Sequence, residues 1–349
     1  MFGLCLICSA LSACHSSEKQ VTVVIPAFYH WQTQLSFSAA EQNYVKALRI
    51  KKFYVKFFDV DWDEAAGQCV PLASVEIDTT GLAGLDIVPT VFITNRCLLN
   101  LPMQEVDSLA GRVFRKIKSL AINPPSEIQF DCDWTAQTQA KYFALLDAIK
   151  KIASAPSYPN LPPSAPLLSA TIRLHQLKYP QKTGVPPVAR GMLMCYNMGD
   201  LDDWATENSI LDTAILKSYL LSTPDYPLPL DVALPLFRWG VLFRDGRLAK
   251  LLNGLSDADL QDTARFAKTA PNRYEVKKST YLKAHYLYAG DQIRLEAVSV
   301  EALAVAARQL ALLRSETQRT VAFYHLDTTA IRLFPKEKIQ ETLGHWTHR

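Results

Sequence analysis

Eight short apolar runs alternate along the chain with segments of helical period. The runs are Val21–Tyr29, Lys52–Val60, Ile87–Ile93, Glu127–Asp133, Ala170–Gln176, Arg190–Tyr196, Leu230–Leu236 and Thr320–Leu326. The helical segments between them are Ser38–Arg49, Glu105–Leu120, Ala136–Ala153, Ile210–Leu221 and Val300–Leu313. Such alternation is typical of parallel sheets, and eight strands are the number that closes a barrel. The sequence therefore predicts an α/β fold, a (β/α)8 TIM barrel over residues 21–349, in preference to an open doubly wound sheet.

The interval between the seventh and eighth runs is much longer than the others. We expect residues 251–298 to be an insertion on the barrel, with a helix over Ser256–Phe266. Within it, Asn272–Tyr288 and Gln292–Val298 flank Ala289-Gly290-Asp291, a pattern typical of a β-hairpin with a tight turn.

The first twenty residues resemble an export signal followed by a short linker. Residues 1–13 are uncharged and largely apolar, too short to span a bilayer and typical of a signal peptide. Leu11-Ser12-Ala13-Cys14 then matches the bacterial lipobox, whose cysteine carries lipid after cleavage. We expect residues 14–20 to form a lipidated tether. A lipid on Cys14 implies a membrane partner and a location in the bacterial cell envelope, with the outer membrane favoured.

Composition excludes several other kinds of site. A net charge of only +3 argues against a nucleic-acid partner, which calls for a basic face. The 13 glycines include no G-x-G arrangement, so dinucleotide and Walker loops are absent. No metal-ligand spacing appears among the cysteines, and we expect neither a metal nor a cofactor. A bridge between Cys69 and Cys97 is one open interpretation, whereas Cys132 and Cys195 lie in apolar runs and are expected to be free and buried.

The fourth run carries the sharpest chemical pattern. Because side chains alternate along a strand, Gln129, Asp131 and Asp133 share one face and Phe130, Cys132 and Trp134 the other. Two carboxylates aimed into a barrel interior raise each other's pKa, as in acid/base sites. Alternatively, they cap the strand end or pair with Arg173. The same parity argument predicts that Arg173 and His175 of the fifth run point inward.

Three of the eight runs resemble those of family 18 chitinase-like proteins. Asp131-Cys132-Asp133-Trp134-Thr135 is similar to the D-x-D-x-E signature of that family's fourth strand. Met192–Asn197 resembles its sixth-strand M-x-Y-D/N segment, and Ala233–Phe237 its seventh-strand L-P-x-Y/F segment. The resemblance implies a (β/α)8 barrel that acts on a glycan.

The resemblance also implies roles for individual residues. Asp131 would orient the substrate, and Tyr196 would donate a hydrogen bond to the developing anion or an acetamido oxygen. Position along the strand, and not the resemblance, makes Asp133 the better acid/base candidate, because it lies nearer the open mouth of the barrel. The family's general acid, a glutamate, is replaced by Thr135. Either another carboxyl supplies the proton, with Asp133, Asp231 and Glu296 as candidates, or the site binds without cleaving.

Aromatic and polar residues close to the predicted strand ends support a glycan partner, because sugar rings stack on aromatic faces. The predicted substrate-binding set is Tyr29, Trp31, Trp62, Trp134, His175, Asn197, Asp231 and Trp239. His325 and Asp327 of the eighth run are weaker candidates for the same pocket. The chain is thus predicted to be a glycoside hydrolase-like envelope lipoprotein; the alternative is a non-catalytic glycan-binding or envelope-assembly lipoprotein with a degenerate glycosidase site.

Overall fold

The computed structural model describes residues 23–155, 165–221, 225–313 and 317–346. The predicted signal peptide, Cys14 and the tether lie outside the described residues. No helix in these ranges combines the length and the apolar character needed to cross a membrane.

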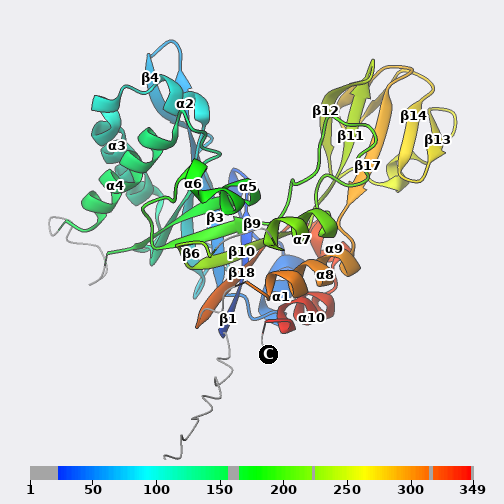
Figure 1. Cartoon of the computed structure of the whole chain (residues 1–349). Helices are drawn as coiled ribbons and strands as arrows, with labels where there is room; N and C mark the ends of the chain where they lie inside the picture. The colour runs from blue at the N-terminus through cyan, green and yellow to red at the C-terminus, as the bar shows by residue number, and fades with distance from the viewer. Residues whose placement is uncertain (1–22, 156–164, 222–224, 314–316, 347–349) are drawn as a thin grey trace, which may run out of the picture.

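Eight parallel strands close into a barrel, as the sequence predicts (Figure 1). They are β1 (Val23–His30), β3 (Lys52–Asp63), β6 (Asp86–Ile93), β7 (Glu127–Asp131), β8 (Leu167–Arg173), β9 (Arg190–Met194), β10 (Leu230–Pro235) and β18 (Gln318–Tyr324). Each pairs with its neighbours in parallel register, and the pairing of β1 with both β18 and β3 closes the ring. The fold is therefore a TIM barrel and not an open sheet.

Helices surround the barrel because apolar side chains on the outer faces of the strands need cover. The helices are α1 (Ala39–Ala47), α2 (Asn95–Asn100), α3 (Val106–Leu120), α4 (Gln139–Ala153), α5 (Leu174–Lys178), α6 (Pro180–Thr183), α7 (Thr213–Leu221), α8 (Val300–Leu310), α9 (Thr328–Leu333) and α10 (Lys336–Gly344), with 3-10 turns η1 (Met103–Glu105) and η2 (Asp257–Leu260). α3 shows how the sequence sets this packing. Its apolar positions recur at helical spacing and bury Leu109, Val113 and Ile117.

The fifth barrel strand is displaced toward the N-terminus of the expected segment. β8 begins at Leu167 and ends at Arg173, because Leu174 starts α5. The Arg173 N–H donates to Gln176 Oε1 at 2.8 Å, which satisfies a backbone group that the strand ladder leaves free. His175 is consequently a helix residue, and its predicted inward-pointing strand position is wrong.

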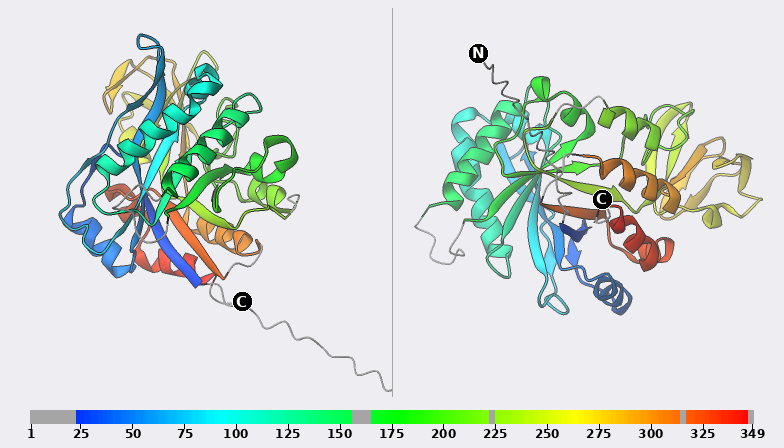
Figure 2. Two further views of the ribbon diagram at one scale, coloured as in Figure 1. Left: turned by 90° about the vertical axis from the view of Figure 1, so that its left-hand side faces the viewer. Right: turned by 60° about the horizontal axis from the view of Figure 1, so that its bottom comes forward.

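The segment of chain between β10 and β18 forms a second sheet, which projects from the barrel (Figures 1 and 2). Its strands, in spatial order, are β12 (Arg247–Asn253), β11 (Arg238–Arg244), β17 (Gln292–Ala297), β14 (Arg273–Val276) and β13 (Phe266–Ala270). All neighbours are antiparallel, and the sheet has its own apolar core, which includes Phe266, Val276 and Ile293. The sheet thus includes β11 and β12, which begin before the expected insertion.

Two details inside this sheet differ from expectation. The segment predicted as a helix over Ser256–Phe266 contains only the four-residue 3-10 turn η2. The predicted strand Asn272–Tyr288 is broken into β14, β15 (Thr280–Leu282) and β16 (His285–Leu287), and β15 pairs with β16. β17 pairs with β14 and β11, so no simple hairpin turns at 289–291. Lys283 and Ala284, both at positive φ, form the turn between β15 and β16 instead.

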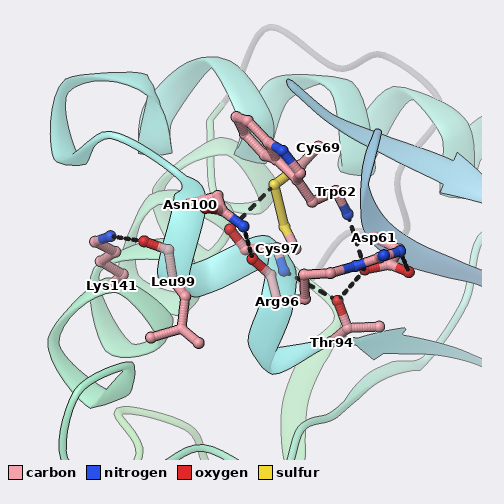
Figure 3. Close-up of a disulfide and its surroundings, with 9 residues drawn as sticks. All are labelled: Asp61, Trp62, Cys69, Thr94, Arg96, Cys97, Leu99, Asn100 and Lys141. Carbon is pink, nitrogen blue, oxygen red and sulfur yellow. Dashed lines mark hydrogen bonds and ion pairs between the residues drawn. A yellow bond between two sulfur atoms is a disulfide. The ribbon is translucent and has the colours of Figure 1, made fainter. Parts of the chain in front are cut away.

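Three further short strands and one disulfide bond add to the barrel. β2 (Gln34–Leu35) pairs with β5 (Glu76–Ile77), and β4 (Gln68–Leu72) adds antiparallel to the extension of β3. A disulfide joins Cys69 of β4 to Cys97 of α2 (Figure 3). Cys132 and Cys195 are free and buried.

Candidate functional site

The barrel interior is polar along one line of side chains from β7. Glu127 accepts from Lys52 Nζ and from Ser169 Oγ, both at 2.5 Å, near the N-terminal end of the strands. One step up, Gln129 Oε1 accepts from the Tyr29 hydroxyl at 2.6 Å. The alternation predicted for β7 is therefore present, because Glu127, Gln129 and Asp131 are all buried on the inner face.

At the C-terminal end of this line, Arg173 joins the two aspartates of the motif. Its Nη2 lies 3.3 Å from Asp131 Oδ1, and its Nε donates to Asp133 Oδ1 in a very short contact. Thr171 donates to the same Asp131 oxygen at 2.6 Å. Burial raises the pKa of Asp131, although Arg173 and Thr171 oppose that shift. Asp133 lies nearer the mouth, with 55% of its side chain exposed.

We call the contacts of Arg173 with Asp131 and Asp133 the Arg173 clamp. A cavity of about 410 Å³ opens above it, and this volume is within the size range of ligand sites. One wall is a nearly continuous aromatic surface formed by Tyr29, Trp31, Tyr196, Phe237, Trp239 and Tyr324. Adjacent ring centroids lie 5.2 to 6.0 Å apart, for example 5.9 Å between Trp31 and Tyr324 and 5.2 Å between Tyr196 and Tyr324. Asp131, Asp133 and Arg173 lie on the polar side. The pocket therefore offers an apolar face beside charged groups.

Tyr196 and Asn197 enter the pocket together from the end of β9. Burial raises the pKa of Tyr196 well above its ordinary value, so its hydroxyl keeps its proton at neutral pH. Asn197 adopts a positive φ of 54°, a conformation that asparagine tolerates better than most residues. His175 does not line the main cavity. It contributes to an adjoining hollow that shares Asp133, Arg173 and both of these residues.

Two tryptophans predicted to line the site lie elsewhere. Trp134 is buried against α4, where its ring stacks on Tyr142 at 5.3 Å and its Nε1 donates to the Thr183 carbonyl at 2.7 Å. Trp62 lies opposite Cys69 near the disulfide, and its Nε1 donates to Glu64 at 3.3 Å. Trp134 lies three residues beyond the end of β7, where its ring packs on Tyr142 of α4. Trp62 lies in the extension of β3 that pairs with β4, beside the disulfide (Figure 3).

Asp231 also lies outside the pocket, at the other end of the barrel. As the second residue of β10, it is at the N-terminal end of the strands. Its carboxylate accepts two hydrogen bonds from Arg190, at 2.9 and 2.8 Å, and one from the Thr320 N–H at 2.6 Å. Its role is to join β9, β10 and β18, and the predicted contact with substrate is wrong.

We expect Asp231→Asn to lower the free energy of unfolding by about 2 kcal/mol, because an amide replaces a charged acceptor of three hydrogen bonds. Denaturant unfolding measures this loss. Glu341→Gln is the control, since the Lys338–Glu341 pair is about half exposed and should contribute little. Equal stabilities of the two variants would contradict the structural role of Asp231.

Glu296, one of the candidate acids, is buried beneath the pocket wall. Its side chain forms an ion pair with the fully buried Arg294 at 2.6 Å. Its other oxygen accepts from Trp239 Nε1 at 2.8 Å and from the backbone N–H of Ser209 at 2.9 Å. Glu296 is not among the residues that line the cavity. It therefore positions Trp239 and does not face a ligand.

Several pocket residues were not in the predicted set. Among them are Phe92, Met194, Phe237, Arg238, Asn253, Tyr324 and Thr329. His325 and Asp327, the weaker candidates, also line the cavity. Tyr324 ends β18 and Phe237 lies two residues after the end of β10, so strand-end position could have identified them. Arg238 and Asn253 belong to the second sheet, and no local pattern in the sequence places that sheet against the barrel mouth. Among the described residues, no three His, Cys, Asp or Glu side chains gather into a potential metal site.

Comparison with solved structures places this barrel in a known structural class. The chain is similar to the spore cortex-lytic enzyme SleL of Bacillus megaterium, with a TM-score of 0.55 and 11% identity over 93% of this chain and 75% of that one. It is also similar to a chitinase from Chromobacterium violaceum (TM-score 0.52, 11% identity, 92% and 99% coverage) and to catalytic domain 2 of the Group II chitinase from Ostrinia furnacalis (TM-score 0.51, 9% identity, 92% and 96% coverage). No protein-family model and no curated protein matches the sequence.

These likenesses are distant in sequence, and they define the fold. The chain is a (β/α)8 barrel, and at the level of the fold the expected distant resemblance to chitinase-like barrels is confirmed.

Proposed function

We propose that the protein is a non-catalytic glycan-binding member of this structural class, with the aromatic-walled cavity as its saccharide site. The observation that carries the proposal is the Arg173 clamp on Asp131 and Asp133. An aromatic wall beside fixed polar groups suits a sugar ring, which presents C–H faces to aromatics and hydroxyls to polar atoms. The chitinases named above supply analogy for a glycan ligand.

Each carboxylate that lines the cavity in the described part of the chain already accepts a hydrogen bond from the protein, which favours binding over hydrolysis. Thr135 occupies the position of the general acid, is exposed and does not line the cavity. Asp133 Oδ1, an oxygen that could carry the transferred proton, accepts from Arg173 instead. The remaining lining carboxylate is Asp327, whose Oδ1 accepts from the Ala330 N–H at 2.6 Å. A glycosidase needs a carboxylic acid with a free proton opposite a second carboxylate.

A place in the cell envelope, with a lipid anchor at Cys14, is part of the same proposal. The Cys69–Cys97 disulfide supports an oxidising compartment, where such bonds persist. The described chain enters the barrel at Val23, at the N-terminal end of β1, whereas the cavity lies at the C-terminal ends of the strands. A lipid attached upstream of β1 would therefore leave the cavity facing away from the membrane surface.

The test is calorimetric binding of chitotetraose and a panel of neutral and acidic oligosaccharides to the full-length protein, with a parallel assay for new reducing ends. We expect binding without cleavage. Trp31→Ala should weaken binding about fivefold or more, because a stacking face is lost. Trp62→Ala is the matched control, since Trp62 is also half-buried but lies outside the cavity, and it should leave affinity within twofold.

Two results would contradict the proposal. One is release of reducing ends that Asp133→Asn abolishes while folding is preserved, which would show that the protein is a glycosidase with Asp133 at its centre. The other is equal weakening by Trp31→Ala and Trp62→Ala, which would place the saccharide elsewhere.

A further inference from the structure

Arg238 belongs to the second sheet and lines the cavity, to which it contributes a positively charged side chain. It is the first residue of β11, and its carbonyl accepts from the Gly254 N–H at 2.9 Å. β10 ends at Pro235 opposite Tyr324, and the Leu236 N–H donates to the Tyr324 carbonyl at 2.6 Å. Arg238 and His325 therefore reach the same cavity from neighbouring strand ends.

The Arg238 guanidinium has no carboxylate partner within the described part of the chain. Its Nε is buried and has no hydrogen-bond acceptor. The carboxylates that line the cavity are engaged elsewhere: Asp131 and Asp133 by Arg173, and Asp327 by the backbone of α9. A buried donor without a partner is costly, so a ligand acceptor that engages the guanidinium would offset a penalty that the described residues leave uncompensated.

The surroundings of Arg238 leave its charge uncompensated. Burial lowers the pKa of His325, so this ring is neutral at pH 7 and adds no charge. The carboxylate of Asp327 lies 3.8 Å from His325 Nε2 and forms no ion pair with Arg238. Arg173 differs from Arg238 because both of its contacts to carboxylates are already made inside the protein.

We infer that Arg238 recognises a carboxylate on the bound saccharide, so that the cavity selects an acidic sugar over a neutral one. This inference rests on the proposed glycan-binding function. A guanidinium binds a carboxylate through two parallel N–H···O bonds, a geometry that neutral hydroxyls do not reproduce. The ligand class is an oligosaccharide that carries a uronate or a lactyl-ether carboxylate. Asn253 and Thr329, which line the cavity, are available to bind hydroxyls of the same ring.

The experiment compares acidic oligosaccharides with their own methyl esters. Calorimetry is run on full-length protein with glucuronate-, galacturonate- and N-acetylmuramate-containing tetrasaccharides, each as free acid and as ester, and with chitotetraose. At least one free acid should bind about 10- to 100-fold more tightly than its ester, the effect of one charge-assisted pair. Arg238→Gln should remove that preference, and Arg238→Lys should retain part of it.

Arg247→Gln is the matched control. Arg247 begins β12 on the same sheet and is exposed, so the variant makes the same change of charge outside the cavity. Thermal melts of all variants verify folding, and Arg238→Lys keeps the test decisive if Arg238→Gln fails to fold.

The outcomes separate this inference from the proposed function. A preference for the free acid that Arg238→Gln removes and Arg247→Gln preserves supports the inference. Binding of acids, esters and chitotetraose with affinities within twofold of one another, unchanged in Arg238→Gln, overturns it and leaves the proposed glycan site standing. If no oligosaccharide of any kind binds, both proposals fail.

Discussion

Glu296→Gln is expected to lower the free energy of unfolding by about 3–5 kcal/mol, the cost of breaking a buried ion pair. Arg294 and Glu296 have fully buried side chains 2.6 Å apart. Glutamine preserves the shape of Glu296 but leaves the Arg294 charge without its counter-charge in a dry interior. Equilibrium unfolding in urea, followed by tryptophan fluorescence, measures the loss.

The same substitution tests how the second sheet is held on the barrel. Arg294 also donates to the carbonyls of Leu201 and Asp203, and Glu296 accepts from Ser209, so the pair joins β17 to the loop that follows β9. Because Trp239 Nε1 donates to Glu296, we expect Glu296→Gln to weaken saccharide binding as well.

Asp262→Asn provides the control for this prediction. The Arg265–Asp262 pair lies in the same insertion but is roughly 40% exposed, so solvent screens it and its loss should cost far less. A cost for Glu296→Gln as small as that for Asp262→Asn would show that the buried charge is compensated in some other way.

Replacing both Cys69 and Cys97 with alanine is expected to cost about 3–4 kcal/mol. The bond closes a loop with a sequence separation of 28, and this is the loss of stability that the chain-entropy estimate gives for a loop of that length. The loop contains strands β5 and β6, and the Arg96–Asp61 ion pair lies beside the bond (Figure 3). Thermal unfolding compared with the wild-type protein measures the change.

A reducing agent supplies the control for the disulfide. Dithiothreitol should lower the unfolding temperature of the wild-type protein toward that of the double variant and leave the double variant unchanged. Cys195→Ala, at a free buried cysteine, should leave the response to reductant intact. Insensitivity of the wild-type protein to reductant would contradict a stabilising bond between Cys69 and Cys97.

Strand periodicity predicted much of the fold and the centre of the site. Each of the eight apolar runs overlaps a barrel strand, because strands buried on both faces require continuous apolar sequence. Alternation along β7 placed Gln129 and Asp131 on one inner face, and the pairing of Asp133 with Arg173 was one of the alternatives that the residue types left open. Apolar runs and side-chain alternation are local properties, because each depends on residues that are close together along the chain.

A position near the predicted end of a strand was a weaker guide to which residues line the cavity. It identified Trp31, Tyr196 and Trp239, which line the cavity, but failed for Trp134, which lies beyond the end of β7 and packs on Tyr142 of α4. It also failed for Asp231, because the residue begins β10, whereas the cavity forms where strands end. For Trp62, an extension of β3 that pairs with β4 moved the ring away from the barrel mouth.

By itself, the sequence determined the closed parallel barrel and the carboxylates at the end of its fourth strand. Only the tertiary structure decided that Arg173 binds Asp133, that Glu296 is buried and that Arg238 lines the cavity. Strand periodicity is a short-range property that can be read along the chain. Charge pairing depends on which distant segments meet, and residues 40 to 42 positions apart along the chain form the Asp–Arg pairs that define this site.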